Sequence, residues 1–144
     1  MKPITQVRQV AQYFRKWAEE NVNTHGFGWR NLTGMCAIAS FEIFDTLRLA
    51  GFNVEYCANS KHAFVIVHES GIEYLVDVTA TQFGRELPKV IVTKYEERPV
   101  NPKRRYFNYW LIESRTRTTE GVRNILSNWP TDQQPLQFQH HMTA

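Results

Sequence analysis

The hydrophobic and polar positions of the first twenty or so residues follow the period of an amphipathic helix. Between about Thr5 and Val22, apolar residues recur at intervals of three or four, and charged residues occupy positions between them. The apolar set is Val7, Val10, Ala11, Phe14, Trp17 and Ala18. This spacing predicts a helix that packs its apolar side on a core.

A second helix is expected to begin after Thr33, whose side chain can cap the helix start, and to run to about Ala50. Gly51 follows at the position where a left-handed residue commonly ends a helix. The segment between the two helices, Asn23–Thr33, mixes asparagine, histidine and glycine, and this composition predicts a loop.

Five later segments have the apolar and β-branched or aromatic pattern of strands, and turn residues separate several of them. They span about residues 52–57, 62–68, 72–78, 89–95 and 106–112. The last of them is aromatic and is expected to complete the sheet. A short helix is expected over Thr119–Asn128. This order predicts an α+β domain with an antiparallel sheet of about four to five strands.

The turn that contains Ser70 and Gly71 joins the second and third of these strands, and two registers of the hairpin are open. A two-residue loop places Phe64 opposite Asp77, whereas a four-residue loop places His62 opposite Asp77. Facing residues share a face, and side chains alternate with period two. Either register therefore predicts that His62 and Asp77 lie on one face of the sheet.

A chain of 144 residues suits a single domain with a core of its own. We expect one catalytic-type domain over residues 1–130. The polar, glutamine-rich segment 131–144 predicts a flexible tail.

The apolar runs are too short to cross a bilayer, so no membrane partner is expected. Charges and glutamines interrupt the N-terminal segment, which lacks the continuous apolar core of a secretory signal. A cytoplasmic protein is the resulting expectation, with Cys36 and Cys57 as free thiols under reducing conditions.

The net charge of +3 is mildly basic, and part of the excess lies between Arg98 and Arg123. Within segment 98–110, three basic residues at 103–105 precede aromatic ones, a combination that can contact phosphates and stack on bases. A solvated basic loop that leads into an aromatic strand explains the same pattern, so nucleic acid is the less favoured partner.

Cys36 is the candidate nucleophile because it falls in the first turn of the second predicted helix. Unpaired amides and the positive end of the helix dipole stabilise an anion there, which favours the thiolate. A free cysteine followed by Ala37 and Ile38 is also typical of a small buried hydrophobe, and this alternative stays open.

His62 and Asp77 supply the other two groups of a nucleophilic cysteine site, a general base and a carboxylate that orients it. A histidine that begins one strand and an aspartate that ends its neighbour are held by rigid elements. His68 is a rival base, but it lies six residues further along the strand, about 20 Å away. We expect His68 to belong to the hairpin tip.

The order Cys, His, Asp, carried by GMCAIASFEIFDTLRLAGFNVEY, HAFVIV and GIEYLVDVTATQFG, resembles the transglutaminase-like group of the papain-like cysteine fold. Arylamine N-acetyltransferases and cysteine-dependent glutamine deamidases share this arrangement. The resemblance covers about residues 29–84. It implies Cys36 as nucleophile, His62 as base and Asp77 as orienter, with the cysteine helix packed on an antiparallel sheet.

In such a site the thiolate attacks an amide, ester or thioester carbonyl, and the protonated histidine assists the leaving group. The amide of Cys36 and a second donor would stabilise the oxyanion. Asn31, Trp29 and Gln82 are the candidates for this second donor. The substrate is expected to be a peptide or protein, and the reaction to be hydrolysis, deamidation or acyl transfer.

No metal or cofactor is expected. Cys57, His62 and His68 lack the close paired spacing of a metal site, and the glycines at 26 and 28 match no nucleotide fingerprint. The competing hypothesis is a binding module that keeps this fold without turnover and contacts a protein or nucleic acid through segment 98–110.

Overall fold

The computed structural model describes residues 3–21, 35–84, 86–99 and 109–128. The helices are α1 (Ile4–Asn21), α2 (Met35–Leu49) and α3 (Thr119–Ser127), with two short 3-10 turns, η1 (Ala80–Gln82) and η2 (Tyr95–Glu97). The strands are β1 (Asn53–Ala58), β2 (Ala63–Glu69), β3 (Ile72–Asp77), β4 (Ile91–Lys94) and β5 (Ser114–Thr116). The predicted α+β class is confirmed.

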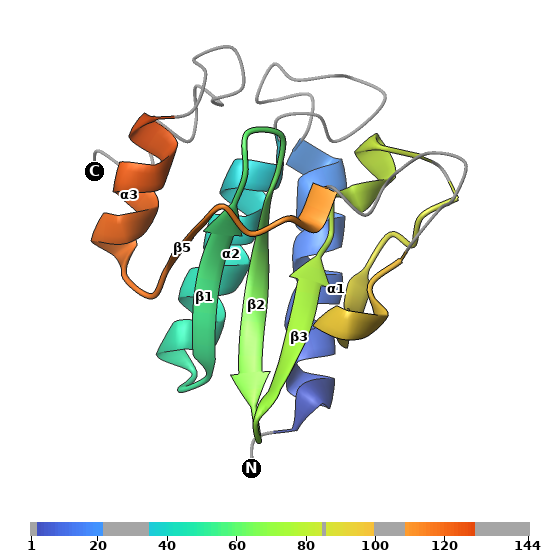
Figure 1. Cartoon of the computed structure of the whole chain (residues 1–144). Coiled ribbons are helices and arrows are strands. Elements are labelled where there is room, and N and C mark those ends of the chain that lie inside the picture. The colour runs from blue at the N-terminus through green and yellow to red at the C-terminus, as the bar shows by residue number, and fades with distance from the viewer. Residues whose placement is uncertain (1–2, 22–34, 85, 100–108, 129–144) are drawn as a thin grey trace.

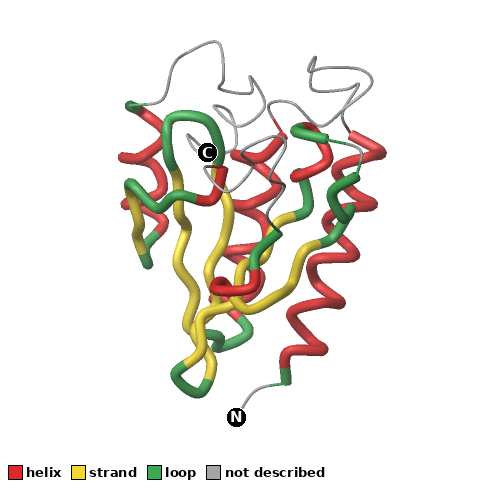
Figure 2. The backbone as a smooth tube through the Cα atoms, turned by 45° about the vertical axis from the view of Figure 1, so that its right-hand side comes forward, coloured by secondary structure: helices red, strands yellow, loops and turns green. Residues whose placement is uncertain are grey.

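The strands form one antiparallel sheet in the order β4-β3-β2-β1-β5. Figure 1 shows α1 and α2 behind this sheet, and α3 beside β1 and β5 at one side. In the view turned by 45°, the long helix α1 runs along one side of the strands from its start near the N-terminus (Figure 2). No helix within the described ranges has the length and apolar content needed to span a membrane.

The first predicted helix is confirmed as α1, and its apolar face lies against the core. Val7, Ala11, Phe14 and Ala18 are buried, while Val10 and Trp17 are partly buried and pack against the same cluster. Burial at intervals of three and four residues leaves the opposite side of α1 for charged groups.

The end of α2 is fixed by the glycine that the sequence pattern indicated. Gly51 has a φ of 91°, in the left-handed region that an L side chain avoids. Its amide donates to the carbonyl of Arg48, and the amide of Phe52 donates to that of Leu47, each at 3.0 Å. These two bonds form a Schellman motif, and the apolar pair Phe52 and Leu47 accompanies it in the core. Thr33, the predicted cap, lies outside the described residues.

The β2–β3 hairpin has the shorter of the two loops considered above. Glu69 pairs with Ile72, so Ser70 and Gly71 alone form the turn, with φ values of 54° and 79°. Two positive φ values in succession are typical of a type I′ turn, whose twist matches that of the strands. Val65 pairs with Val76, and the register therefore continues to Phe64 opposite Asp77.

The prediction of an aromatic strand up to Ile112 is wrong for its described part. Residues 109–112 do not join the sheet, and the strand beyond β1 is β5. The side-chain amide of Asn59 donates to the carbonyls of Tyr109 (3.0 Å) and Leu111 (2.8 Å). Because a side chain uses these carbonyls, the segment crosses the end of the sheet instead of extending it. Residues 106–108 lie outside the described part.

The sheet separates two apolar clusters. The larger lies between the sheet and the helices. The smaller lies on the other face and includes Cys57, Phe64, Leu75 and Trp110. A side chain on the second face can thus be as deeply buried as one under the helices, because residues 109–112 and the segment before β4 cover that face.

The predicted C-terminal helix is confirmed as α3, capped by Thr118, whose hydroxyl accepts from the amide of Gly121 at 2.9 Å. A Cβ added at Gly121 would lie 1.7 Å from Oγ1 of Thr116. The absence of a side chain at this position lets the helix begin directly against β5.

Candidate active site

His62 and Asp77 form a buried ion pair at one end of the sheet. Nε2 of His62 lies 2.6 Å from Oδ2 of Asp77, and the two residues are 0% and 1% exposed. His62 precedes β2, two residues before the position opposite Asp77, so the pair is diagonal across the hairpin. The prediction that these two side chains share a face is confirmed.

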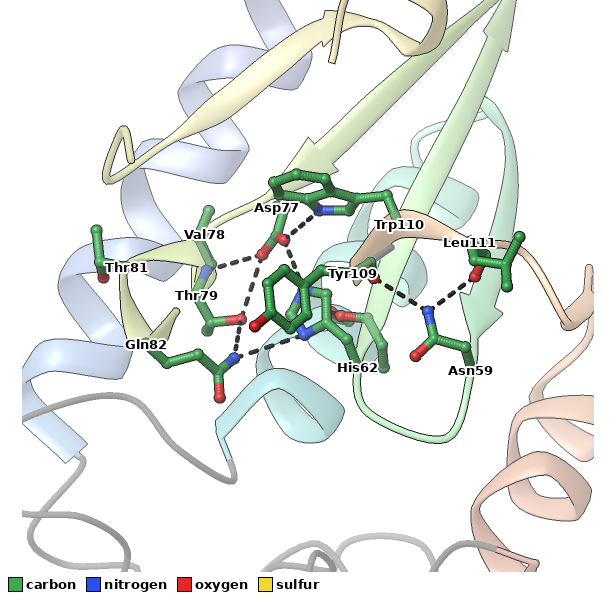
Figure 3. A network of polar contacts seen from close by, with 12 residues as sticks. Asn59, His62, Asp77, Val78, Thr79, Thr81, Gln82, Tyr109, Trp110 and Leu111 are labelled. Carbon is green, nitrogen blue, oxygen red and sulfur yellow. Dashed lines mark hydrogen bonds and ion pairs between the residues drawn. The ribbon is translucent and has the colours of Figure 1, made fainter. Parts of the chain in front are cut away.

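Three further donors hold the carboxylate of Asp77 (Figure 3). The amide and the hydroxyl of Thr79 donate to Oδ1 at 2.9 and 3.2 Å. The indole Nε1 of Trp110 donates to Oδ2 at 2.8 Å. Both oxygens are therefore held in place, and the carboxylate can act as a rigid acceptor for the imidazole.

Cys36 is the second residue of α2 and is 4% exposed. Its thiol is one of the groups that raise the pKa of His62, through a hydrogen bond to the imidazole and through its charge. Because Nε2 bonds to Asp77, Nδ1 is the ring nitrogen left for the thiol. The three residues singled out in the sequence are thus brought together from α2, the start of β2 and the end of β3.

Burial disfavours the protonated imidazole and acts to lower the pKa of His62. The charge of Asp77 and the hydrogen bond to it, helped by Cys36, outweigh burial and raise the pKa to about 10. Burial likewise acts to raise the pKa of Asp77, but His62, Thr79 and Trp110 lower it overall. The pair is therefore stable as imidazolium and carboxylate.

Gln82 is the described member of the three oxyanion candidates. Its Nε2 lies 3.5 Å from Nδ1 of His62 and 3.4 Å from Oγ1 of Thr79. Its place in η1, five residues after Asp77, puts an amide donor beside Nδ1, the ring nitrogen that Asp77 does not bond. Asn31 and Trp29 lie outside the described residues.

An aromatic stack closes one side of the imidazole. The Phe83 ring lies edge-on to His62 with centroids 4.8 Å apart, and it stacks on Tyr109 at 3.7 Å with an interplanar angle of 8°. Phe83, Tyr109 and Gln82 are partly exposed. Partly exposed side chains therefore lie directly beside the buried imidazole.

Sequence reasoning missed Thr79 and Trp110. Thr79 had a usable signal, since an aspartate at the end of a strand commonly bonds to the amide two residues on. The sequence held no signal for the contact of Trp110 with Asp77, because the two residues are 33 positions apart and Trp110 lies in a segment expected to be a strand.

The other cysteine has different surroundings. Cys57 is fully buried in the second cluster, and burial is the main reason that its pKa rises to about 12. Both cysteines are free. Cys57 is a buried hydrophobe of the kind weighed for Cys36, and it lies on the face of β1 away from α2.

His68 lies beside the hairpin turn, as expected, within a cluster of charged groups. Its Nε2 bonds to Glu55, its Nδ1 lies 3.9 Å from Glu73, and the ligand atoms of these three residues lie within 4.8 Å of one another. Such a group could hold a metal ion, but the guanidinium of Arg115 already bonds both carboxylates. Residues 100–108, most of the basic aromatic segment, lie outside the described residues, as does 131–144.

No family model, curated protein or solved structure matches the chain in comparisons with known proteins.

Proposed function

We propose that this protein is a thiol-dependent enzyme that acts on an amide-type carbonyl, with Cys36 as nucleophile, His62 as general base and acid, and Asp77 as orienter. The observation that carries the proposal is the 2.6 Å contact between the buried side chains of His62 and Asp77, together with the Cys36 thiol that also raises the pKa of His62. A nucleophile, a base and a group that orients the base are the parts that such chemistry needs.

In the first step, the Cys36 thiolate attacks the carbonyl carbon, and a carbon–sulfur bond forms as the carbonyl electron pair moves to oxygen. His62, protonated at Nδ1, then gives its proton to the leaving amine or alkoxide as the tetrahedral intermediate collapses to a thioester. Water or an amine attacks the thioester, His62 takes its proton, and the thiolate leaves. The overall reaction is hydrolysis or deamidation when water attacks the thioester, and acyl transfer when an amine attacks it.

The oxyanion of the intermediate requires at least one hydrogen-bond donor. The backbone amide of Cys36 is suited to this role because the first turn of a helix has amides without intrahelical partners. Gln82 is the second donor in this proposal, supported by the nearness of its Nε2 to Nδ1 of His62. The partly exposed side chains of Gln82, Phe83 and Tyr109 mark the side from which substrate reaches the thiol.

The resemblance to transglutaminase-like enzymes supports the same reading, because it assigns the three roles to the same three residues. A peptide or protein substrate and a cytoplasmic location are parts of this proposal that follow from the resemblance and from the sequence pattern.

The experiment compares the two thiols in the native protein. Iodoacetamide should modify Cys36 at least ~100-fold faster than Cys57 at pH 7, since a thiolate beside an imidazolium reacts and a buried thiol of raised pKa does not. Mass spectrometry of the two cysteine peptides measures both rates. p-Nitrophenyl acetate should leave an acetyl group on the wild type and on Cys57→Ala, but none on Cys36→Ala. Equal alkylation rates, or acetylation that persists in Cys36→Ala, would overturn the proposal.

A further inference from the structure

Arg15 of α1 is bonded to the turn that follows Asp77. Its Nη1 donates to the carbonyl of Val78 at 3.0 Å and to the hydroxyl of Thr81 at 2.8 Å. Its Nε donates to Glu19 at 2.8 Å, and only 12% of the side chain is exposed. One guanidinium therefore connects the first helix to a turn more than sixty residues away in the sequence.

The turn held by Arg15 carries two polar groups of the site. Thr79 lies between the two residues that accept from Arg15, and its amide and hydroxyl both donate to Oδ1 of Asp77. The hydroxyl of Thr79 also lies 3.4 Å from Nε2 of Gln82. In Figure 3, the residues from Asp77 to Gln82 follow one another around this single turn beside His62.

We propose that Arg15 is a positioning residue of the active site: by fixing the turn at both Val78 and Thr81, it sets the orientation of Asp77 and the place of the Gln82 amide. This inference rests on the proposed function. A loosened turn would let the carboxylate move away from Nε2 of His62 and would carry the Gln82 donor away from Nδ1. Misplacement of a catalytic group by about 1 Å is enough to lower a rate strongly.

The forked donors of arginine suit this role better than the single ammonium of lysine. Nη1 contacts two acceptors on the turn while Nε bonds Glu19 on the helix, and a planar guanidinium holds these bonds in one geometry. Lysine offers one point charge on a flexible stem and cannot reproduce all three contacts.

Arg8 provides a matched control because it makes a comparable contact from the same helix. Its Nη2 donates to the carbonyl of Val92 in β4 at 3.2 Å. Both arginines thus connect α1 to a backbone carbonyl near the sheet, but Val92 contributes no side chain to the site. If the role of Arg15 is purely structural, replacing either arginine should lower thermal stability and neither replacement should change the pH profile of Cys36 alkylation.

The test measures the pH dependence of Cys36 alkylation by iodoacetamide in Arg15→Met, Arg15→Lys and Arg8→Met, with thermal unfolding in parallel. Among the described residues, Asp77 and Cys36 are the titratable groups that shift the pKa of His62, and Tyr56 is affected by the charge of Cys36. Arg15→Met should lower the rate at pH 6 about tenfold and move the midpoint to higher pH, because a less fixed Asp77 supports the imidazolium less well. Arg15→Lys should have a rate and a midpoint between those of the wild type and Arg15→Met. Arg8→Met should keep the wild-type pH profile but lose thermal stability.

Thr81→Ala removes one of the two bonds to the turn without changing a charge, and it serves if Arg15→Met fails to fold. It should lower the rate at pH 6 about threefold with the same direction of midpoint shift. Wild-type profiles in Arg15→Met or Thr81→Ala would overturn the role of Arg15 and leave the proposed function intact. A wild-type Cys36 that reacts no faster than Cys57 would instead overturn the proposed function, and the role of Arg15 with it.

Discussion

Two histidine–carboxylate pairs lie on the same face of the same sheet, one at each end of the β2 strand. His62 bonds to Asp77 at one end, and His68 bonds to Glu55 at the other. In each pair the carboxylate lies on a neighbouring strand, two residues from the directly opposite position. The hydrogen bond between imidazole and carboxylate is therefore common to both and cannot by itself mark an active site.

The surroundings of the two pairs differ in ways that assign them different roles. Asp77 is fully buried and receives neutral donors from Thr79 and Trp110, so its charge acts on His62. Glu55 receives two bonds from the guanidinium of Arg115, at 2.8 and 2.6 Å, and this contact is the main reason that its pKa falls to about 2. The charge of Glu55 is neutralised by Arg115, so this pair stabilises the sheet. The charged partner of Asp77 is His62, so the charge of Asp77 can shift the pKa of that histidine.

The largest expected effect separates the two histidines directly. His62→Gln should lower the rate of Cys36 alkylation at pH 7 by about 30-fold, because it removes the imidazolium that stabilises the thiolate and an ordinary thiol is only a few per cent ionised at that pH. His68→Gln should change the rate by less than about twofold. Peptide mapping by mass spectrometry gives both rates, and circular dichroism checks that each variant is folded.

Asp77→Asn and Glu55→Gln extend the same contrast to the carboxylates of the two pairs and leave both imidazoles in place. Asp77→Asn should follow His62→Gln, because the tautomer and the charge of the ring depend on Asp77. A larger effect on the alkylation rate at His68 or Glu55 than at His62 or Asp77 would reverse the assignment of the two pairs.

A smaller effect is expected at Trp110, whose indole is a donor to Asp77 that has no counterpart at Glu55. Trp110→Phe keeps most of the buried aromatic volume but removes the 2.8 Å bond to Oδ2, so the pKa of Asp77 should rise and the rate of Cys36 alkylation at pH 6 should fall about fivefold. Tyr95→Phe is the control, because the Tyr95 hydroxyl donates to the backbone carbonyl of Trp110 and not to the site. Equal rates in the two variants would remove Trp110 from the site.

The smallest expected effect concerns stability at the second pair. The folded pKa of Glu55 lies below its ordinary value of 4.5, so its ion pairs stabilise the fold above about pH 4.5 and lose this contribution as the pH falls toward 2. Glu55→Gln should lower the free energy of unfolding by about 2 kcal/mol at pH 7, allowing for the solvent around Arg115, and by much less at pH 3. Urea titrations at pH 7, 5 and 3 measure the difference, and a difference that persists unchanged at pH 3 would contradict the ionic explanation.

The elements whose determinants are local could be predicted from the sequence. Residue spacing gave α1, the glycine at 51 gave the end of α2, and the pattern from 52 to 78 gave three strands in the correct order. Period-two alternation also predicted that His62 and Asp77 share a face, which holds in both registers. The choice of register needed the φ values of Ser70 and Gly71, and these follow from the twist of the folded hairpin.

The features that could not be predicted depend on contacts between distant parts of the chain. Trp110 reaches Asp77, and Arg15 reaches Val78 and Thr81, through geometry that exists only after the helices and the sheet are packed. The aromatic segment was mistaken for a strand because aromatic residues are enriched in strands, where their side chains pack on a sheet. Trp110 is fully buried on the sheet, but its backbone makes no hydrogen-bonded pairing with a strand among the described residues. Cys36, His62 and Asp77 could be singled out because they lie at the ends of elements that the pattern defines.

The two-residue turn at Ser70 and Gly71 sets which residues of β2 and β3 face each other, including those at the far end of the hairpin. Asp77 follows the turn by six residues and His62 precedes it by eight, so roughly 25 Å of strand lies between the loop and the imidazole. A shift of the hairpin register by one residue would turn Asp77 to the opposite side of the sheet while the hairpin could still pair. The conformation of a surface turn at one end of the hairpin therefore decides which face carries the carboxylate of Asp77 at the other end.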